Sequence, residues 1–145
     1  LGIHHKRLWD IVEETLRKMV PPQNFEPTEK KIDSFRSGHG TILFFEEQKA
    51  VEALQAQFPL YKDKMPIFSE HASAMVQLAT WIALESEGFG ASLQHYNPLI
   101  NEAVQKEWNL PESWELVAQM PFGVPTAEPN EKEFLPIDQR LKVFK

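Results

Sequence analysis

The sequence predicts one α/β domain, in which helices and strands alternate along the chain and pack in layers. Segments with apolar residues at helical spacing alternate with short apolar runs that are typical of strands. The 145 residues, of which 42% are apolar, suffice for one hydrophobic core without disulfides or a structural metal. No internal repeat or break in composition divides the chain, so we expect a single domain over residues 1–145.

The first half of the chain predicts two amphipathic helices and the clearest strand. Apolar residues recur at helical spacing over residues 6–20, and Pro21-Pro22 ends that helix. The apolar run 41–45 is typical of a buried strand, and a second amphipathic helix follows over residues 51–58. Between the first helix and the strand, prolines and charged residues are mixed, and no helix is predicted there.

The second half predicts a long apolar helix, two short strands and a further helix. Residues 68–86 are apolar on nearly every side, which is typical of a helix that is buried all round. Such a helix needs neighbours on several faces, either from a second subunit or from a segment that precedes this chain. Gly88 ends this helix, and residues 91–95 predict a short strand. The pattern then predicts an amphipathic helix over 98–108 and a third strand over 115–120.

Composition and spacing exclude several classes of function. The net charge of −6, without a basic stripe, argues against a nucleic-acid partner. The longest apolar run, 75–84, is half as long as a membrane-spanning helix, so no membrane span is predicted. The absence of cysteine removes thiol chemistry and suits a reducing compartment, from which we expect a cytoplasmic protein. His39, His71 and His95 do not form a metal-binding motif, so no metal site is expected.

Signatures of other enzyme classes are missing from the sequence. The Gly-x-Gly turn at residues 88–90 follows a helix, so we interpret it as a helix end and a tight turn rather than a dinucleotide-binding loop. No serine has the Gly-x-Ser-x-Gly setting of a nucleophile. Carboxylate pairs such as Glu46-Glu47 are interpreted as the solvated ends of strands or helices.

Two polar groupings are candidates for a binding site. Gln94, His95 and Tyr96 end a predicted strand, and ligands gather at the carboxyl ends of strands in open α/β sheets. The alternative is a polar strand end that reaches solvent. Arg140 and Lys142 lie two residues apart in an extended tail, so they point the same way and suit a phosphate. The alternative there is a solvated basic tail.

Five blocks of the sequence together resemble the nitroreductase family, and most closely its fatty-acid-repression-mutant branch. The blocks span residues 8–12, 40–46, 87–96, 119–123 and 140–144, so the resemblance covers essentially the whole chain in order. It implies an α+β fold, with a small, mainly antiparallel sheet flanked by helices in three layers. It also implies a homodimer built around long central helices, with one FMN per subunit at the interface between the subunits.

The resemblance assigns roles to both polar groupings. The strand end would present main-chain groups of Gln94, His95 and Tyr96 to the flavin ring, and Arg140 and Lys142 would lie beside the FMN phosphate. Many family members carry an acidic residue followed by glycine where this sequence has His95-Tyr96. The side chains at this point therefore differ from the family pattern.

The activity that the resemblance implies is that of an FMN-dependent NAD(P)H oxidoreductase, which reduces nitroaromatics or quinones by alternating half-reactions. The flavin carries the chemistry, so no catalytic side chain is required. Tyr61 and Phe68, ahead of the long apolar helix, are expected to line the acceptor pocket. The family's Arg- and Ser-rich segment and its Asn-x-Gln stretch do not occur before the predicted first helix, so we expect the chain to lack the family's N-terminal segment.

Two other functions remain open at this point. One is a non-catalytic dimer of the same fold that binds a ligand or signals stress. The other does not depend on the family resemblance. It is an α/β domain that binds an anionic metabolite at Arg140 and Lys142. Flavin content and NAD(P)H oxidation distinguish the enzyme from the non-catalytic dimer. The anion-binding domain is excluded if replacing both cations by alanine leaves the binding of a phosphate ligand unchanged.

Overall fold

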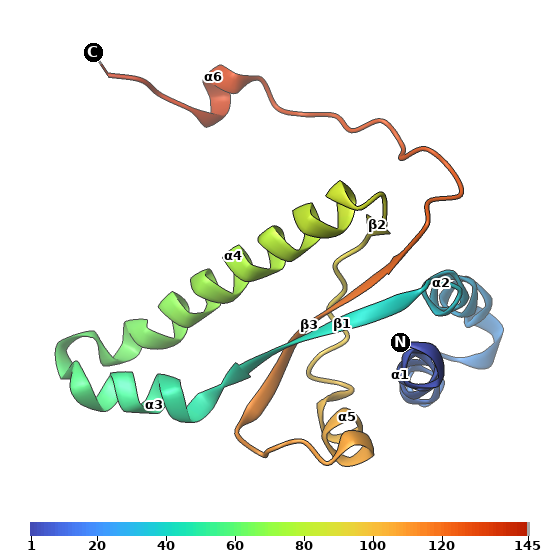
Figure 1. Ribbon diagram of the computed structural model, residues 1–145, viewed down its shortest axis with the longest axis horizontal. Coiled ribbons are helices and arrows are strands. Elements are labelled where there is room, and N and C mark those ends of the chain that lie inside the picture. Colours follow the sequence, from blue (N-terminus) through green and yellow to red (C-terminus); the bar gives the residue numbers. More distant parts are fainter. Residues whose placement is uncertain (145) are drawn as a thin grey trace.

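A small antiparallel sheet separates two layers of helices (Figure 1). In the computed structural model, which describes residues 1–144, the strands are β1 (Gly40–Glu47), β2 (Gly90–Ala91) and β3 (Trp114–Gly123). Their order is β1-β3-β2, and β3 pairs antiparallel with both neighbours. The prediction of α/β from alternation alone is wrong, because the last strand inserts between the two earlier ones in the opposite direction. The α+β class implied by the resemblance is confirmed.

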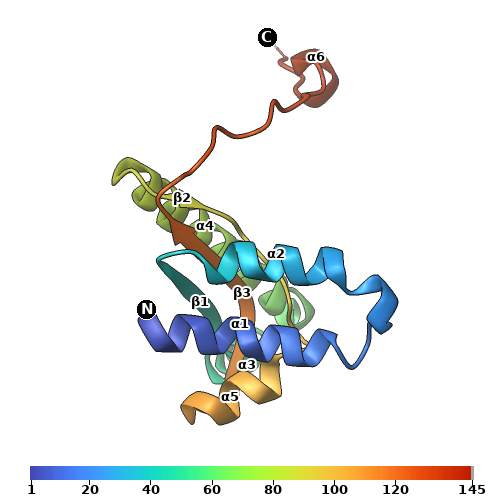
Figure 2. The same cartoon turned by 90° about the vertical axis from the view of Figure 1, so that its right-hand side faces the viewer.

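Three helices cover one face of the sheet and form the main core (Figure 2). They are α1 (Gly2–Leu16), α2 (Glu26–Arg36) and α5 (Asn101–Trp108). The buried side chains of this core are Leu8, Trp9, Ile11, Val12, Phe25, Ile32, Ile100, Val104 and Leu116. The helix predicted over residues 6–20 is confirmed, although it begins and ends four residues earlier than expected.

Helix α2 lies where no helix was predicted, so that expectation is wrong. Pro27 stands in its first turn, where the N–H that proline lacks would have had no helical partner. Its first turn is acidic and its last turn carries Arg36, as the helix dipole favours. The helix buries Ile32 alone, so its apolar periodicity is weak.

A charged cluster around Arg36 joins α2 to α1. The guanidinium lies 3.2 Å from Asp10 Oδ1 and donates hydrogen bonds to Glu13 and Asp33. Because Arg36 donates to Glu13, it holds the pKa of that carboxyl below its usual range. Arg36 is 22% exposed, so solvent screens these contacts only in part.

The other face of the sheet packs against the long helix α4 (Met65–Ser86), which α3 (Gln48–Gln57) and the short helix η2 (Pro59–Lys64) precede. Phe44, Ala118 and Met120 are buried here, and Trp81 and Leu84 of α4 pack on them. None of the residues of α4 is buried. The prediction that this helix is buried all round is therefore wrong for the chain by itself, because the sheet covers one side of the helix only.

The turn after α4 has the hydrogen bonds of a helix end. Gly88 adopts a φ of 84°, its N–H donates to Glu85 O, and the Phe89 N–H donates to Leu84 O. This confirms that the Gly-x-Gly turn ends a helix. The strand predicted next is shorter than expected: β2 has two residues, and pairing resumes at an isolated bridge between Gln94 and Gln119.

Beyond β3 the chain leaves the body of the molecule, as both views show (Figures 1 and 2). Residues 125–144 are exposed throughout and include one short helical turn, α6 (Ile137–Arg140). A further short turn, η1 (Pro22–Asn24), connects α1 to α2.

Candidate functional site

The segment after β2 is held at the edge of the sheet by main-chain hydrogen bonds to β3. The Gln94 N–H donates to Gln119 O at 2.7 Å, and the Gln119 N–H donates to Gln94 O at 2.9 Å. The predicted site residues Gln94, His95 and Tyr96 lie in this segment. The two hydrogen bonds between Gln94 and Gln119 therefore hold all three residues beside β3.

The side chain of Gln119 adds two further hydrogen bonds to this segment. Its Oε1 accepts the Tyr96 N–H at 2.7 Å, and its Nε2 donates to Asn97 Oδ1 at 3.3 Å. Gln119 is fully buried, and a buried amide lowers stability unless its polar atoms have partners. These two bonds satisfy the amide and tie residues 96 and 97 to the sheet.

Sequence reasoning placed Gln119 in a family block but gave it no role. A signal was present, because an amide stands between Ala118 and Met120 in a strand whose other central residues are apolar. Alternate residues of a strand face opposite sides, and Ala118 and Met120 belong to the core beneath α4. Gln119 therefore faces the other core, where Tyr96 lies.

Tyr96 is anchored in the main core by its ring. The ring meets Trp9 edge to face, with 5.9 Å between ring centroids. Burial raises the pKa of the phenol, so the hydroxyl is neutral at physiological pH. The contact of the Tyr96 ring with Trp9 therefore helps to hold the main chain of this segment against the main core.

His95 differs from both of its neighbours. Its side chain is exposed, whereas Gln94 and Tyr96 are half-buried. The N–H groups of Gln94 and Tyr96 are engaged by Gln119, and among residues 1–144 the N–H of His95 has no hydrogen-bond partner. Of the three main-chain donors assigned to a ligand, the one at His95 is free.

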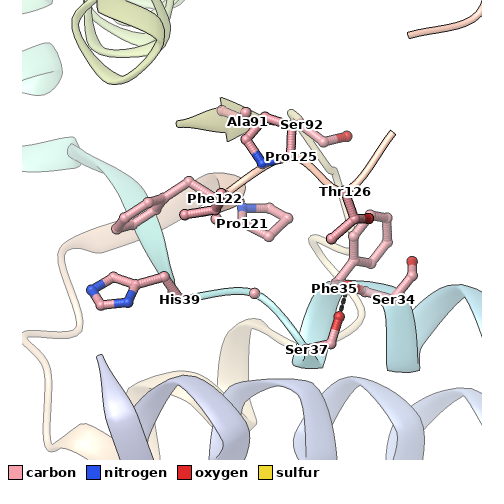
Figure 3. Close-up of a pocket in the computed structure, with 14 residues that line it drawn as sticks. Ser34, Phe35, Ser37, His39, Ala91, Ser92, Pro121, Phe122, Pro125 and Thr126 are labelled. Carbon is pink, nitrogen blue, oxygen red and sulfur yellow. Dashed lines mark hydrogen bonds between the residues drawn. The ribbon is translucent and has the colours of Figure 1, made fainter. Parts of the chain in front are cut away.

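A cavity of about 660 Å³ opens between the end of α2, β2 and the end of β3 (Figure 3). Its volume lies in the range of small-molecule sites, roughly 300–1,000 Å³. Polar side chains on its wall are Ser34, Ser37, His39, Ser92 and Thr126. The sequence did not predict this cavity, and none of the predicted site residues lines it. One residue of the wall, Ser92, is only two positions before Gln94 in the sequence.

Arg140 and Lys142 lie in the exposed tail, away from the strand end (Figure 1). The tail leaves the body at the end of β3 and is exposed over residues 125–144. The structure therefore does not bring the two predicted polar groupings together within one chain.

Tyr61 and Phe68 lie near the start of α4, in η2 and in the first turn of the helix. Both are exposed, at 58% and 50%. A rise of about 1.5 Å per residue places Phe68 roughly 30 Å from Gly88, at the opposite end of the helix from β2 (Figure 1). These side chains are thus distant from the strand end of their own chain.

Two features, a metal-binding cluster and a membrane-spanning helix, are absent from the part of the chain that the structure describes. Across residues 1–144, no three side chains of His, Cys, Asp or Glu gather closely enough to hold a metal ion. Over the same residues, no helix combines the length and the apolar character needed to cross a membrane.

Comparisons with known proteins agree with this architecture. HBN1 of Saccharomyces cerevisiae is 37% identical over 140 residues, which are 97% of this chain and 68% of HBN1. The nitroreductase FRM2 of the same yeast is 36% identical over 139 residues, 93% of this chain and 66% of FRM2. The chain thus spans about two thirds of the length of these relatives.

Solved structures of nitroreductases share the fold. Nitroreductase CinD from Lactococcus lactis, in complex with chloramphenicol, superposes with a TM-score of 0.89 at 46% identity. The match covers 99% of this chain and 73% of CinD, which has also been solved with 4-nitrophenol. The family model described as "Nitroreductase family" matches residues 3–124, most of the chain. The chain belongs to the nitroreductase family.

Proposed function

We propose that this protein is an FMN-dependent oxidoreductase that uses NAD(P)H to reduce nitroaromatic or quinone acceptors. The observation that carries the proposal is its likeness to CinD, at 46% identity over 99% of the chain. CinD has been solved with chloramphenicol and with 4-nitrophenol, and both compounds carry a nitro group on a benzene ring. FMN, when bound, supplies the chemistry by accepting a hydride from the nicotinamide and passing it to the acceptor.

The groups that the chain offers fit FMN in kind. The free N–H of His95 is a donor for the polar edge of a flavin ring, and it stands on a segment that Gln119 holds in place. Arg140 and Lys142 are cations suited to charge-assisted hydrogen bonds with a phosphate. In one chain these groups lie apart, so the proposal includes a homodimer that completes the site at its interface.

Helix α4 supports the homodimer. Its exposed apolar residues are Ile67, Phe68, Met75, Val76, Leu78 and Ile82. Monomeric proteins rarely leave so many large apolar side chains together in water, and such a surface marks an interface. A second copy of α4 is the occupant whose chemistry matches this surface.

The dimer also gives a role to Tyr61 and Phe68. Two copies of α4 that pack antiparallel about a two-fold axis place the start of one helix beside the end of the other. Phe68 of the partner subunit would then lie near the strand end that carries His95. In this arrangement the two aromatic side chains line the acceptor pocket and exclude water from it.

The absorption spectrum of the purified protein tests this function directly. We expect the visible bands of bound flavin, the release of about one FMN per subunit on heating, and oxidation of NADH or NADPH that depends on 4-nitrophenol or a benzoquinone. A protein that stays colourless after FMN is added would contradict the proposal. That result would favour the non-catalytic dimer of the same fold.

A further inference from the structure

One buried residue makes four hydrogen bonds to the segment that carries the proposed flavin contact. The main chain of Gln119 bonds to Gln94 in both directions, at 2.7 and 2.9 Å. Its side chain bonds to the Tyr96 N–H at 2.7 Å and to Asn97 Oδ1 at 3.3 Å. His95 is thus flanked on both sides by residues that Gln119 holds.

These bonds decide which main-chain donor is available. With the N–H groups of Gln94 and Tyr96 engaged, the N–H of His95 faces no competing partner among residues 1–144. The Tyr96 ring packs edge to face against Trp9, a contact that opposes rotation of the segment about its length. The direction of the His95 N–H therefore depends on contacts buried behind it.

We propose that Gln119 is a positioning residue for the flavin site, which acts by fixing the His95 N–H toward the ring. The inference rests on the proposed function, since it presumes that a flavin lies at this strand end. An apolar residue would pack the buried position without the desolvation penalty of an amide. The amide is satisfied only by the segment that it orients, so its contribution is to the geometry of that segment.

Gln119→Met tests the inference, because methionine has a similar volume and lacks both polar atoms. Loss of an ordering hydrogen bond should weaken FMN binding about fivefold to tenfold, measured by the quenching of flavin fluorescence. The visible absorption band of the bound flavin should shift toward that of free FMN, because hydrogen bonds to the ring determine its position. Asn97→Ala removes the acceptor of the Gln119 amide and should change both readouts in the same direction, which keeps the test open if the first variant does not fold.

Met120→Ala is the matched control. Met120 is the next residue of β3, is equally buried, and faces the opposite core. Its truncation should lower the melting temperature at least as much as Gln119→Met, through the cavity that it leaves. The FMN dissociation constant and the absorption band should stay as in the unaltered protein.

The possible outcomes separate this inference from the proposed function. If the unaltered protein binds FMN and Gln119→Met matches it in affinity and spectrum, the positioning role is wrong and the oxidoreductase proposal stands. If Met120→Ala produces the same changes, general loosening explains them and the positioning role is again wrong. If the unaltered protein binds no FMN, both proposals fail together.

Discussion

The Nδ1 atom of His5 lies 2.8 Å from the hydroxyl oxygen of Thr41, between α1 and β1. The other ring nitrogen, Nε2, lies 3.1 Å from Arg36 O, which can only accept, so the proton is assigned to Nε2. Nδ1 then accepts the Thr41 hydroxyl, which in turn accepts the Trp9 indole N–H at 3.0 Å. The neutral imidazole thus connects α1, α2 and β1.

Acid should destabilise the protein through His5. Burial is the main cause that lowers the pKa of His5 below its usual value of 6.5. The folded state therefore binds fewer protons than the unfolded state, so stability is fully present above about pH 6.5 and is lost as the pH falls toward the folded-state pKa. We expect the free energy of unfolding, from urea titrations between pH 8 and pH 5, to fall with acid.

His5→Asn is the comparison for that measurement. The variant should be less stable at pH 8, where the neutral imidazole makes its hydrogen bonds, and its stability should change less between pH 7 and pH 5. Equal pH dependence in the two proteins would show that other groups cause the acid lability.

Arg36 should contribute more to stability than Arg17, although both bind Glu13. Arg36 is 22% exposed and connects α2 to Asp10 and Glu13 of α1, whereas Arg17 is 47% exposed. Charged hydrogen bonds that are shielded from water are worth about 2 kcal/mol, and exposed ion pairs are worth far less.

We therefore expect Arg36→Met to lower the free energy of unfolding by about 2 kcal/mol and Arg17→Met to lower it much less, in urea titrations at pH 7. The stability of the Arg36→Met variant should also depend less on acid below pH 5, since Glu13 loses the partner that lowers its pKa. Equal losses from the two variants would contradict the importance of shielding.

The exposed face of α4 should hold two copies of the chain together. Leu78 and Ile82 are 60% and 61% exposed and lie one turn apart, so a glutamate at each would place charge in the proposed interface. Light scattering should give twice the chain mass of 16.8 kDa for the unaltered protein and the mass of one chain for Leu78→Glu/Ile82→Glu.

Ile3→Glu is the control for this prediction. Ile3 is 78% exposed on α1, in the layer on the other side of the sheet, and its replacement should leave the mass unchanged. A double variant that keeps the mass of a dimer would place the interface elsewhere. A monomeric double variant that also loses FMN would link the interface to the flavin site.

The elements that bury an apolar stripe were predictable from the sequence, whereas the contacts of the site were not. The first helix shows the periodicity of one buried face, and the strand at 41–45 is a continuous apolar run that contributes side chains to both cores. Helix α2 buries only Ile32 and gave no such signal. The apolar pattern of α4 indicated burial but could not say whether the sheet, another segment or a second chain provides it.

The role of Gln119 was beyond sequence reasoning for a different reason. Its side-chain partners, Tyr96 and Asn97, are 23 and 22 residues away in the chain. Their approach depends on the order of strands in the sheet, which places β3 beside β2. A sequence pattern identifies the buried amide but not the segment that it binds.

Arg140 and Lys142 should distinguish FMN from riboflavin. If the two cations bind the phosphate, Arg140→Ala/Lys142→Ala removes charge-assisted hydrogen bonds that riboflavin cannot form. Each such bond is worth about 1.5–3 kcal/mol when it is shielded, so FMN binding should weaken by at least about tenfold. Riboflavin binding, measured by the same fluorescence quenching, should change little.

Lys132→Ala supplies the control, because Lys132 is another exposed cation of the same tail. It should leave the affinity for FMN unchanged, which shows that a general loss of positive charge is not the cause. Raising the salt concentration should weaken FMN binding to the unaltered protein and have little effect on the double variant, since screening acts on the charges that the variant lacks. Equal weakening of FMN and riboflavin would instead mean that the tail contributes to the ring site or to the fold, and the phosphate role would be wrong.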